Sequence, residues 1–330
     1  MYSEDELASA VAAGVVPEET AAAFRAHVTA LRHTQAADEE YFRLVTGFND
    51  IFVVMACALL LVSVTWIGTA SAAWMGALAL TAASWALAEF FVRRRRMALP
   101  AIVLLLSFVG GVYYLGYALF GHTLTALAVA SALVAAAATL HWLRFRVPIT
   151  VAAGAGAALG LVIALLFKLL PWTTLYANAI EFVGGLAMFA LAMYWDARDT
   201  QRRTRKSDVA FWLHLLAAPL LVHPVFSQLS RFDGRVDLAH ALAAIAVYAL
   251  IALISLAIDR RALMASALVY VLVAFSVVLK EFGMVSLGFA FTALLIGSLL
   301  LLLSAFWHPC RRWLLGAFPD AALRRLPPLR

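Results

Sequence analysis

Residues 51–69, with the sequence IFVVMACALLLVSVTWIGT, contain no charged side chain. An α-helix needs about 20 apolar residues to cross the hydrocarbon core of a bilayer. Further apolar runs of similar length follow with short interruptions. They predict spans at residues 51–69, 72–92, 98–119, 123–142, 149–170, 176–195, 209–228, 238–258, 262–281 and 284–306. We therefore predict an all-α fold, a polytopic transmembrane helix bundle of about ten spans.

The composition excludes the soluble classes. Of the 330 residues, 65% are hydrophobic and only 13% are charged, and the mean hydropathy is +0.92. This is more apolar surface than one globular core can hide, so the lipid bilayer is the expected partner. The net charge of +6 falls in short loops beside the spans, where anionic headgroups attract it. We therefore expect no binding to nucleic acid.

The basic residues alternate between the gaps that separate these runs. Of 25 Lys and Arg residues, only four fall in alternate gaps, namely Lys168, Arg231, Arg235 and Lys280. Cytoplasmic loops carry an excess of Lys and Arg, so the richer gaps are expected on the cytoplasmic side. With an even number of spans, both the N-terminus and the C-terminus are then cytoplasmic.

The amino-terminal region precedes the first span and has helix signals of its own. Ser3 and Glu6 have the spacing of a capping box, Gly14 can end a first helix, and Pro17 suits the first turn of a second. A helical hairpin of this size is too small for a catalytic domain, so we interpret it as a packing or protein-partner-binding element. The predicted organisation is a cytosolic juxtamembrane hairpin, a transmembrane bundle and a cytosolic basic tail, at residues 1–47, 48–308 and 309–330.

The segments Glu6-Leu7 and Gly14-Val15-Val16-Pro17-Glu18, with many spans after them, resemble bacterial families of multi-pass inner-membrane proteins of unknown function. The resemblance covers roughly the first 35 residues and the general layout. It implies a location in the bacterial cytoplasmic (inner) membrane. It implies no activity and no site residue.

Polar groups inside the spans are the candidates for chemistry, because each is costly in the bilayer. Glu181 lies in the span at 176–195, and Asn178 lies one turn earlier on the same face. Together with other polar groups of the outer half, they would line a pocket open to the periplasm. The expected substrate-binding residues are Glu181, His223, His214, Asn178, Lys280 and Glu281. The alternative for Lys280 and Glu281 is that they anchor a helix end in the headgroups.

The span at 209–228 contains Pro219 and Pro224, which remove helix hydrogen bonds and predict a kink or break. Its His214 and His223 are about 13 Å apart along an ideal helix, too far to bind one metal. Two haem groups would each need a histidine pair from different spans, and the available pairs are His141 with His214 and His240 with His223. A hydrogen-bonded packing histidine is the more common case. We therefore expect no metal, no cofactor and no catalytic residue.

Glycines recur in several spans at positions that favour close helix contacts. Gly156 and Gly160 have the small-xxx-small spacing, and Gly110-Gly111 and Gly184-Gly185 form two pairs. No strand precedes them, so they do not form a nucleotide-binding loop.

Two classes of function fit these observations. The first is a small-solute transporter or channel-like protein with a periplasm-facing polar pocket. The alternative is a non-transporting membrane scaffold or partner subunit that recruits a protein through residues 1–47. A haem- or His-based membrane enzyme is a third and weaker option, so we lean against an enzyme.

Overall fold

The computed structural model describes residues 4–24, 48–200, 202, 204–231, 238–261, 264, 266–268, 271–272 and 288–316. The chain separates into two compact units, residues 1–42 and 43–330. In the first unit, α1 (Glu4–Ala12) ends at a turn in which Gly14 has φ +71°. This positive φ is readily available only to glycine, which explains why the helix stops there. A second helix follows at 18–24, directly after Pro17.

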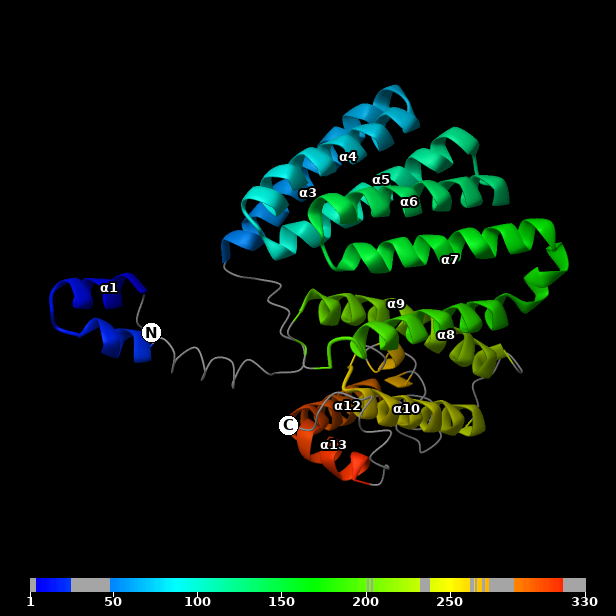
Figure 1. Cartoon of the computed structure of the whole chain (residues 1–330). Coiled ribbons are helices and arrows are strands. Elements are labelled where there is room, and N and C mark those ends of the chain that lie inside the picture. Colours follow the sequence, from blue (N-terminus) through cyan, green and yellow to red (C-terminus); the bar gives the residue numbers. More distant parts are fainter. Residues whose placement is uncertain are drawn as a thin grey trace. The chain divides into compact units, whose positions relative to one another are not determined.

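The second unit is built from long helices joined by short turns. Figure 1 shows α3 to α8 following one another as long helices, each reversing the direction of the one before. Helix α9 packs against both α7 and α8. The elements are α3 (Phe48–Ser71), α4 (Ala73–Ala88), the π-helix η1 (Glu89–Arg94), α5 (Ala98–Phe120), α6 (Leu124–Phe145), α7 (Ile149–Leu169), the 3₁₀ helix η2 (Pro171–Tyr176), α8 (Ala177–Asp196), α9 (Arg205–Arg231), α10 (Leu238–Ile258), α12 (Gly288–Ala305) and α13 (Trp307–Leu315). No described residue lies in a β-strand.

Seven of the described helices are long and apolar enough to cross a membrane, and they correspond to the first seven predicted spans. The helices α10 and α12 are also apolar and lie on the predicted spans 238–258 and 284–306. The predicted span 262–281 falls mostly outside the described residues. The total of ten spans and the cytoplasmic termini stay predictions.

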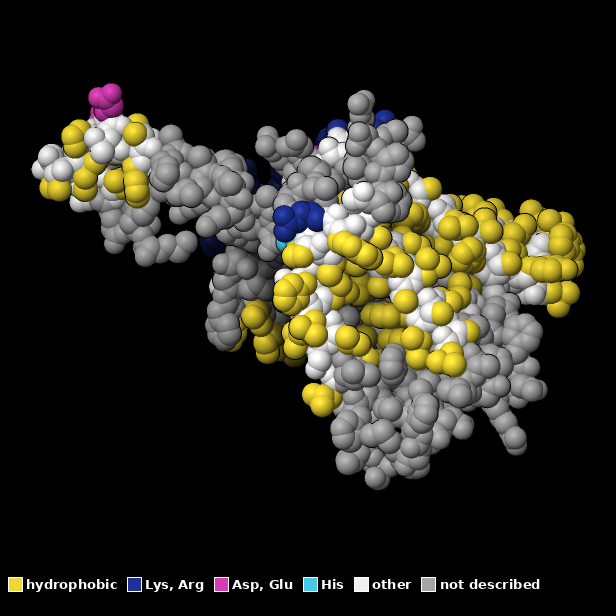
Figure 2. All heavy atoms as spheres, turned by 90° about the horizontal axis from the view of Figure 1, so that it is seen from below, with side chains coloured by type: hydrophobic (Ala, Val, Ile, Leu, Met, Phe, Trp, Pro, Cys, Tyr) yellow, Lys and Arg dark blue, Asp and Glu magenta, His cyan; other side chains and the backbone are white. Residues whose placement is uncertain are grey.

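The surface of the second unit is that of a membrane protein. Large apolar side chains such as Leu59, Trp66 and Val162 are more than 60% exposed. Figure 2 shows hydrophobic side chains over much of the visible face, with the few visible Lys and Arg side chains toward one end. Exposing this much apolar surface to water is unfavourable, whereas contact with lipid chains avoids that cost.

Two of the predicted glycine positions lie at tight contacts between helices. A Cβ at Gly111 would lie 2.5 Å from Thr81 Oγ1, and one at Gly185 would lie 2.9 Å from the backbone carbon of Leu220. A Cβ at Gly156 would meet its nearest neighbour at an ordinary 3.4 Å. The small-xxx-small spacing therefore did not identify the tightest contacts. It describes the spacing of small residues on one helix and carries no information on which atoms of the neighbouring helix lie opposite them.

Helix α9 continues through both Pro219 and Pro224 without a break. Because proline has no N–H, the carbonyl of Leu220 loses its usual helix donor at position 224. Gly185 of α8 packs against this carbonyl. The backbone group released by the proline therefore meets protein, as a membrane helix requires.

Candidate functional site

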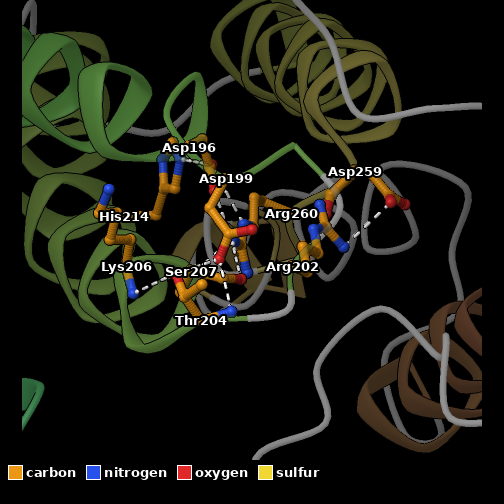
Figure 3. A network of polar contacts seen from close by, with 9 residues as sticks. All are labelled: Asp196, Asp199, Arg202, Thr204, Lys206, Ser207, His214, Asp259 and Arg260. Atoms are coloured by element: carbon orange, nitrogen blue, oxygen red, sulfur yellow. Dashed lines mark hydrogen bonds and ion pairs between the residues drawn. The ribbon is translucent and has the colours of Figure 1, made fainter. Parts of the chain in front are cut away.

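A cluster of buried charged side chains lies where the ends of four helices meet. Helix α8 ends there, α9 begins there, and residues just after α10 and in α13 reach the same place. Figure 3 shows the central residues from close by. We define the charged cluster as Asp196, Arg202, Ser207, His214, Asp259, Arg260, Trp307 and Arg311.

The turn between α8 and α9 is fixed by its own polar side chains. Asp199 Oδ2 accepts hydrogen bonds from the backbone N–H of Thr204 at 2.7 Å and from its hydroxyl at 2.6 Å. The Thr204 hydroxyl in turn accepts from the N–H of Lys206 at 3.3 Å, which caps the start of α9. These contacts position the first turn of α9 beside the last turn of α8.

Asp196 is the centre of the charged cluster. Its Oδ1 accepts from Arg260 Nη2 at 2.5 Å, and its Oδ2 lies 3.3 Å from Arg260 Nε and 2.9 Å from His214 Nε2. The arginine therefore approaches the carboxylate with two nitrogens, the strongest arrangement for this pair. Asp196 is 5% exposed, Arg260 1% and His214 0%.

Arg260 has further acceptors that match its planar donor group. Its Nη2 lies 3.3 Å from both the carbonyl and the hydroxyl oxygen of Ser207 at the start of α9. The Ser255 hydroxyl donates to the Arg260 carbonyl. Arg260 thus connects the end of α10 to both α8 and α9.

Asp259, the neighbour of Arg260, makes a second set of contacts. Its φ of +59° turns the chain directly after α10. Asp259 Oδ2 lies 3.1 Å from Arg202 Nη1 and 3.8 Å from Arg311 Nη1, and Oδ1 accepts from Trp307 Nε1 at 2.8 Å. Two adjacent residues therefore link α10 to different partners, Arg260 to α8 and α9, and Asp259 to α13 and the α8–α9 turn.

His214 contributes an imidazole ring to the charged cluster. Its Nε2 faces Asp196, whereas its buried Nδ1 has no hydrogen-bond partner among the described residues. The Phe189 ring lies edge-on at 5.3 Å. Because a carboxylate only accepts hydrogen bonds, Nε2 carries the proton. The ring can thus exchange a proton only through Nδ1 or by losing its contact with Asp196.

The predicted substrate-binding residues fall at two ends of α8 and α9. Asn178 Nδ2 donates to Ser227 Oγ at 3.0 Å, and Glu181 is half-buried on the next turn of α8. His223 is exposed, whereas His214 lies in the charged cluster. The 18 residues from Asn178 to Asp196 correspond to about 27 Å of helix, so these two groups lie at opposite ends of α8. Lys280 and Glu281 lie outside the described residues.

The sequence pattern does not identify Asp196, Asp259 or Arg260 as site residues. By sequence, Arg260 is one of the loop charges that indicate orientation, and neither aspartate has a predicted role. An available signal was the position of each acid, directly at the end of an apolar run and beside arginines. An aspartate at such a helix end has arginines close by in the chain. It can therefore be buried together with an arginine as an ion pair.

Two of the four histidines considered as haem ligands, His141 and His214, contact protein side chains. His141 is buried, with Nδ1 3.1 Å from Thr150 Oγ1, and its ring packs near Phe145 at 4.6 Å and Trp85 at 6.1 Å. His214 contacts Asp196, as described above. His240 lies where side chains are not described. No group of three or more metal-ligating side chains occurs within the described part of the chain.

An open groove of about 480 Å³ lies between α3, α4 and α5. Apolar side chains form most of its wall, with hydroxyls from Thr65, Thr69 and Ser107. The groove shares no residue with the charged cluster.

Comparisons with known sequence families, with curated proteins and with solved structures give no match.

Proposed function

We propose that this membrane protein carries a small polar solute across the bacterial inner membrane, and that the charged cluster is its closed cytoplasmic gate. In this proposal about ten helices span the bilayer and both termini lie in the cytoplasm. The gate separates α8 and α9 on one side from α10 and α13 on the other.

The burial of Asp196 with Arg260 is the observation that carries the proposal. Replacing a buried ion pair by apolar side chains is often neutral or stabilising, so stability alone does not explain this pair. Ionisable groups inside membrane proteins tend to mark pathways for ions or solutes. An ion pair is well suited to a gate, because water can solvate both partners when the helices separate.

The opposite end of α8 and α9 supplies the proposed solute pocket. Asn178, Glu181 and His223 are proposed to belong to it, and the arginine distribution supports a periplasmic position for this end. Lys280 and Glu281 are proposed to complete it. The motion that opens the gate would pass through α9, whose two prolines weaken its hydrogen-bond ladder at mid-length.

Cysteine labelling in native membranes tests the gate. Ser207 is buried against Arg260, so Ser207→Cys, with Cys57 and Cys310 replaced by Ser, should react slowly with a membrane-impermeant maleimide added from the cytoplasmic side. Adding Asp196→Asn should accelerate labelling, because it releases Arg260. Equal, slow labelling in both proteins would argue against a gate.

The Glu181→Gln variant tests the pocket separately. If Glu181 binds solute, this variant should change any transport or growth phenotype that the intact protein supports. No change would remove Glu181 from the pocket but would leave the gate to be judged by labelling.

The second candidate function is a scaffold or partner subunit, favoured by the tight glycine contacts of Gly111 and Gly185. Such contacts suit a rigid bundle that does not open. In that case residues 1–47 would recruit a protein partner, and Ser207→Cys would stay unlabelled in every variant. An enzymatic or haem-binding role has less support, because His141 and His214 each contact a protein side chain.

A further inference from the structure

Six arginines lie in two segments, 93–96 and 144–146, which one carboxylate joins where η1 meets the end of α6. Glu89 accepts hydrogen bonds from Arg144 Nε at 2.6 Å and Nη2 at 2.9 Å, and from Arg93 Nη1 at 3.3 Å. These contacts bring together segments that are 55 residues apart in the chain. We define the arginine patch as Arg93, Arg94, Arg95, Arg96, Arg144 and Arg146. Against the single Glu89, the patch has five positive charges in excess.

All six guanidinium groups are on exposed residues. Arg94, Arg96 and Arg146 have no acidic partner among the described residues, and Arg95 lies over the Phe90 ring at 5.6 Å. This differs from the charged cluster, where each arginine is buried against an aspartate. Arg94, Arg96 and Arg146 therefore carry exposed donors that no described acidic side chain uses.

Two of these arginines occupy backbone positions that disfavour them. Arg96 has φ +55° and Arg146 has φ +57°, in the left-handed region where glycine is the usual residue at a helix end. Arg202 has the same backbone geometry at φ +54°, and its Nη1 and Nη2 both contact Asp259. An arginine at such a position indicates that the side chain is needed despite the backbone cost.

The surroundings of the arginine patch identify the chemistry of its ligand. Helices α4 and α6 are long and apolar enough to cross a membrane, so in a bilayer the patch at their ends would lie at the membrane surface. Next to it, Phe90 is 43% exposed and Leu143 is 63% exposed. A ligand that satisfies both features has a negatively charged group for the arginines and an apolar chain for these two side chains.

We propose that the arginine patch binds the headgroup of an anionic phospholipid. The phosphate oxygens accept hydrogen bonds from Arg96 and Arg146, since guanidinium groups match phosphate geometry with two parallel donors. The acyl chains lie along Phe90 and Leu143. Glu89 holds Arg144 and Arg93 in place and keeps η1 beside α6. The proposal requires that the chain lies in a membrane, but not that it transports a solute.

The test uses the full chain in phosphatidylcholine vesicles with a trace of spin-labelled phosphatidylglycerol or, separately, spin-labelled phosphatidylcholine. The measured quantity is the preference of the protein for the anionic label. Wild type should prefer it, and Arg96→Gln with Arg146→Gln should lower the preference by about fivefold for each arginine. Rising salt should weaken the wild-type preference, because exposed charges are screened.

A matched control removes two exposed arginines elsewhere, Arg198→Gln with Arg312→Gln. This variant should keep nearly all of the preference. An equal loss in both variants would mean that only the total charge matters, and no loss in the Arg96 and Arg146 variant would also overturn the site. If the glutamine variant does not fold, a second variant carries Arg96→Gly and Arg146→Gly, since glycine adopts a positive φ without strain. This variant must also lose the preference for the anionic label.

Discussion

Asp196→Asn should destabilise the protein strongly, because it leaves a buried arginine without its carboxylate. Arg260 is 1% exposed and contacts Asp196 at 2.5 and 3.3 Å. Removing one partner of a buried pair costs about 3–5 kcal/mol. Asparagine keeps one acceptor oxygen, and Ser207 still accepts from Arg260, so we expect the lower end, about 3 kcal/mol. The assay is reversible unfolding of the full chain in mixed micelles, followed by tryptophan fluorescence.

Two further variants separate the effect of the charge from the effect of burial. Asp196→Leu combined with Arg260→Met removes both charges and should restore most of the stability. Glu89→Gln removes a carboxylate that also binds an arginine with two nitrogens, but both side chains are about a third exposed, so its loss should be clearly smaller. The reasoning is refuted if Asp196→Asn costs less than about 1 kcal/mol, or if the double variant is less stable than Asp196→Asn.

Three smaller effects can be measured in the same unfolding assay. Gly185→Ala should cost about 1–3 kcal/mol, because the new Cβ would lie 2.9 Å from the Leu220 backbone, whereas Gly156→Ala should be nearly neutral; equal effects would contradict the packing. Arg146→Gly should stabilise by about 0.5–1 kcal/mol by relieving its positive φ, and a loss of stability would show that the side chain has a structural partner. Thr123→Ala should cost about 1 kcal/mol, because Thr123 Oγ1 accepts from the third N–H of α6; Thr123→Ser should keep most of that stability.

The sequence predicted the helices well because their signal is local. Each apolar run specifies a helix by its length and composition alone, and the first seven predicted spans all lie on helices of the structure. Gly14 likewise ends α1 as expected, since a left-handed turn is favoured by glycine wherever it occurs. These features depend on a few consecutive residues and not on which helices become neighbours.

The charged cluster could not be predicted in the same way, because it depends on helix adjacency. Asp196 and Arg260 are 64 residues apart in the chain, and nothing in the local pattern shows that α8 and α10 end at the same place. The Asn178 contact shows the same limitation. Sequence spacing placed Asn178 and Glu181 on one face, but the partner, Ser227, belongs to another helix.

The charged cluster and the arginine patch contain arginines that differ in their effect on the membrane surface. Arg202, Arg260 and Arg311 are buried against Asp196 and Asp259, so in the folded protein they contribute little field at the membrane surface. The arginine patch remains exposed, with one carboxylate for six guanidinium groups. The orientation of the chain is decided during membrane insertion, when every arginine still contributes its charge. Lipid binding and gating depend instead on which arginines have no acidic partner after folding. Changing Arg260 should therefore alter stability and gating without altering lipid preference, and changing Arg96 or Arg146 should do the reverse. If both kinds of variant changed both properties, the charged cluster and the arginine patch would have to be treated as a single site.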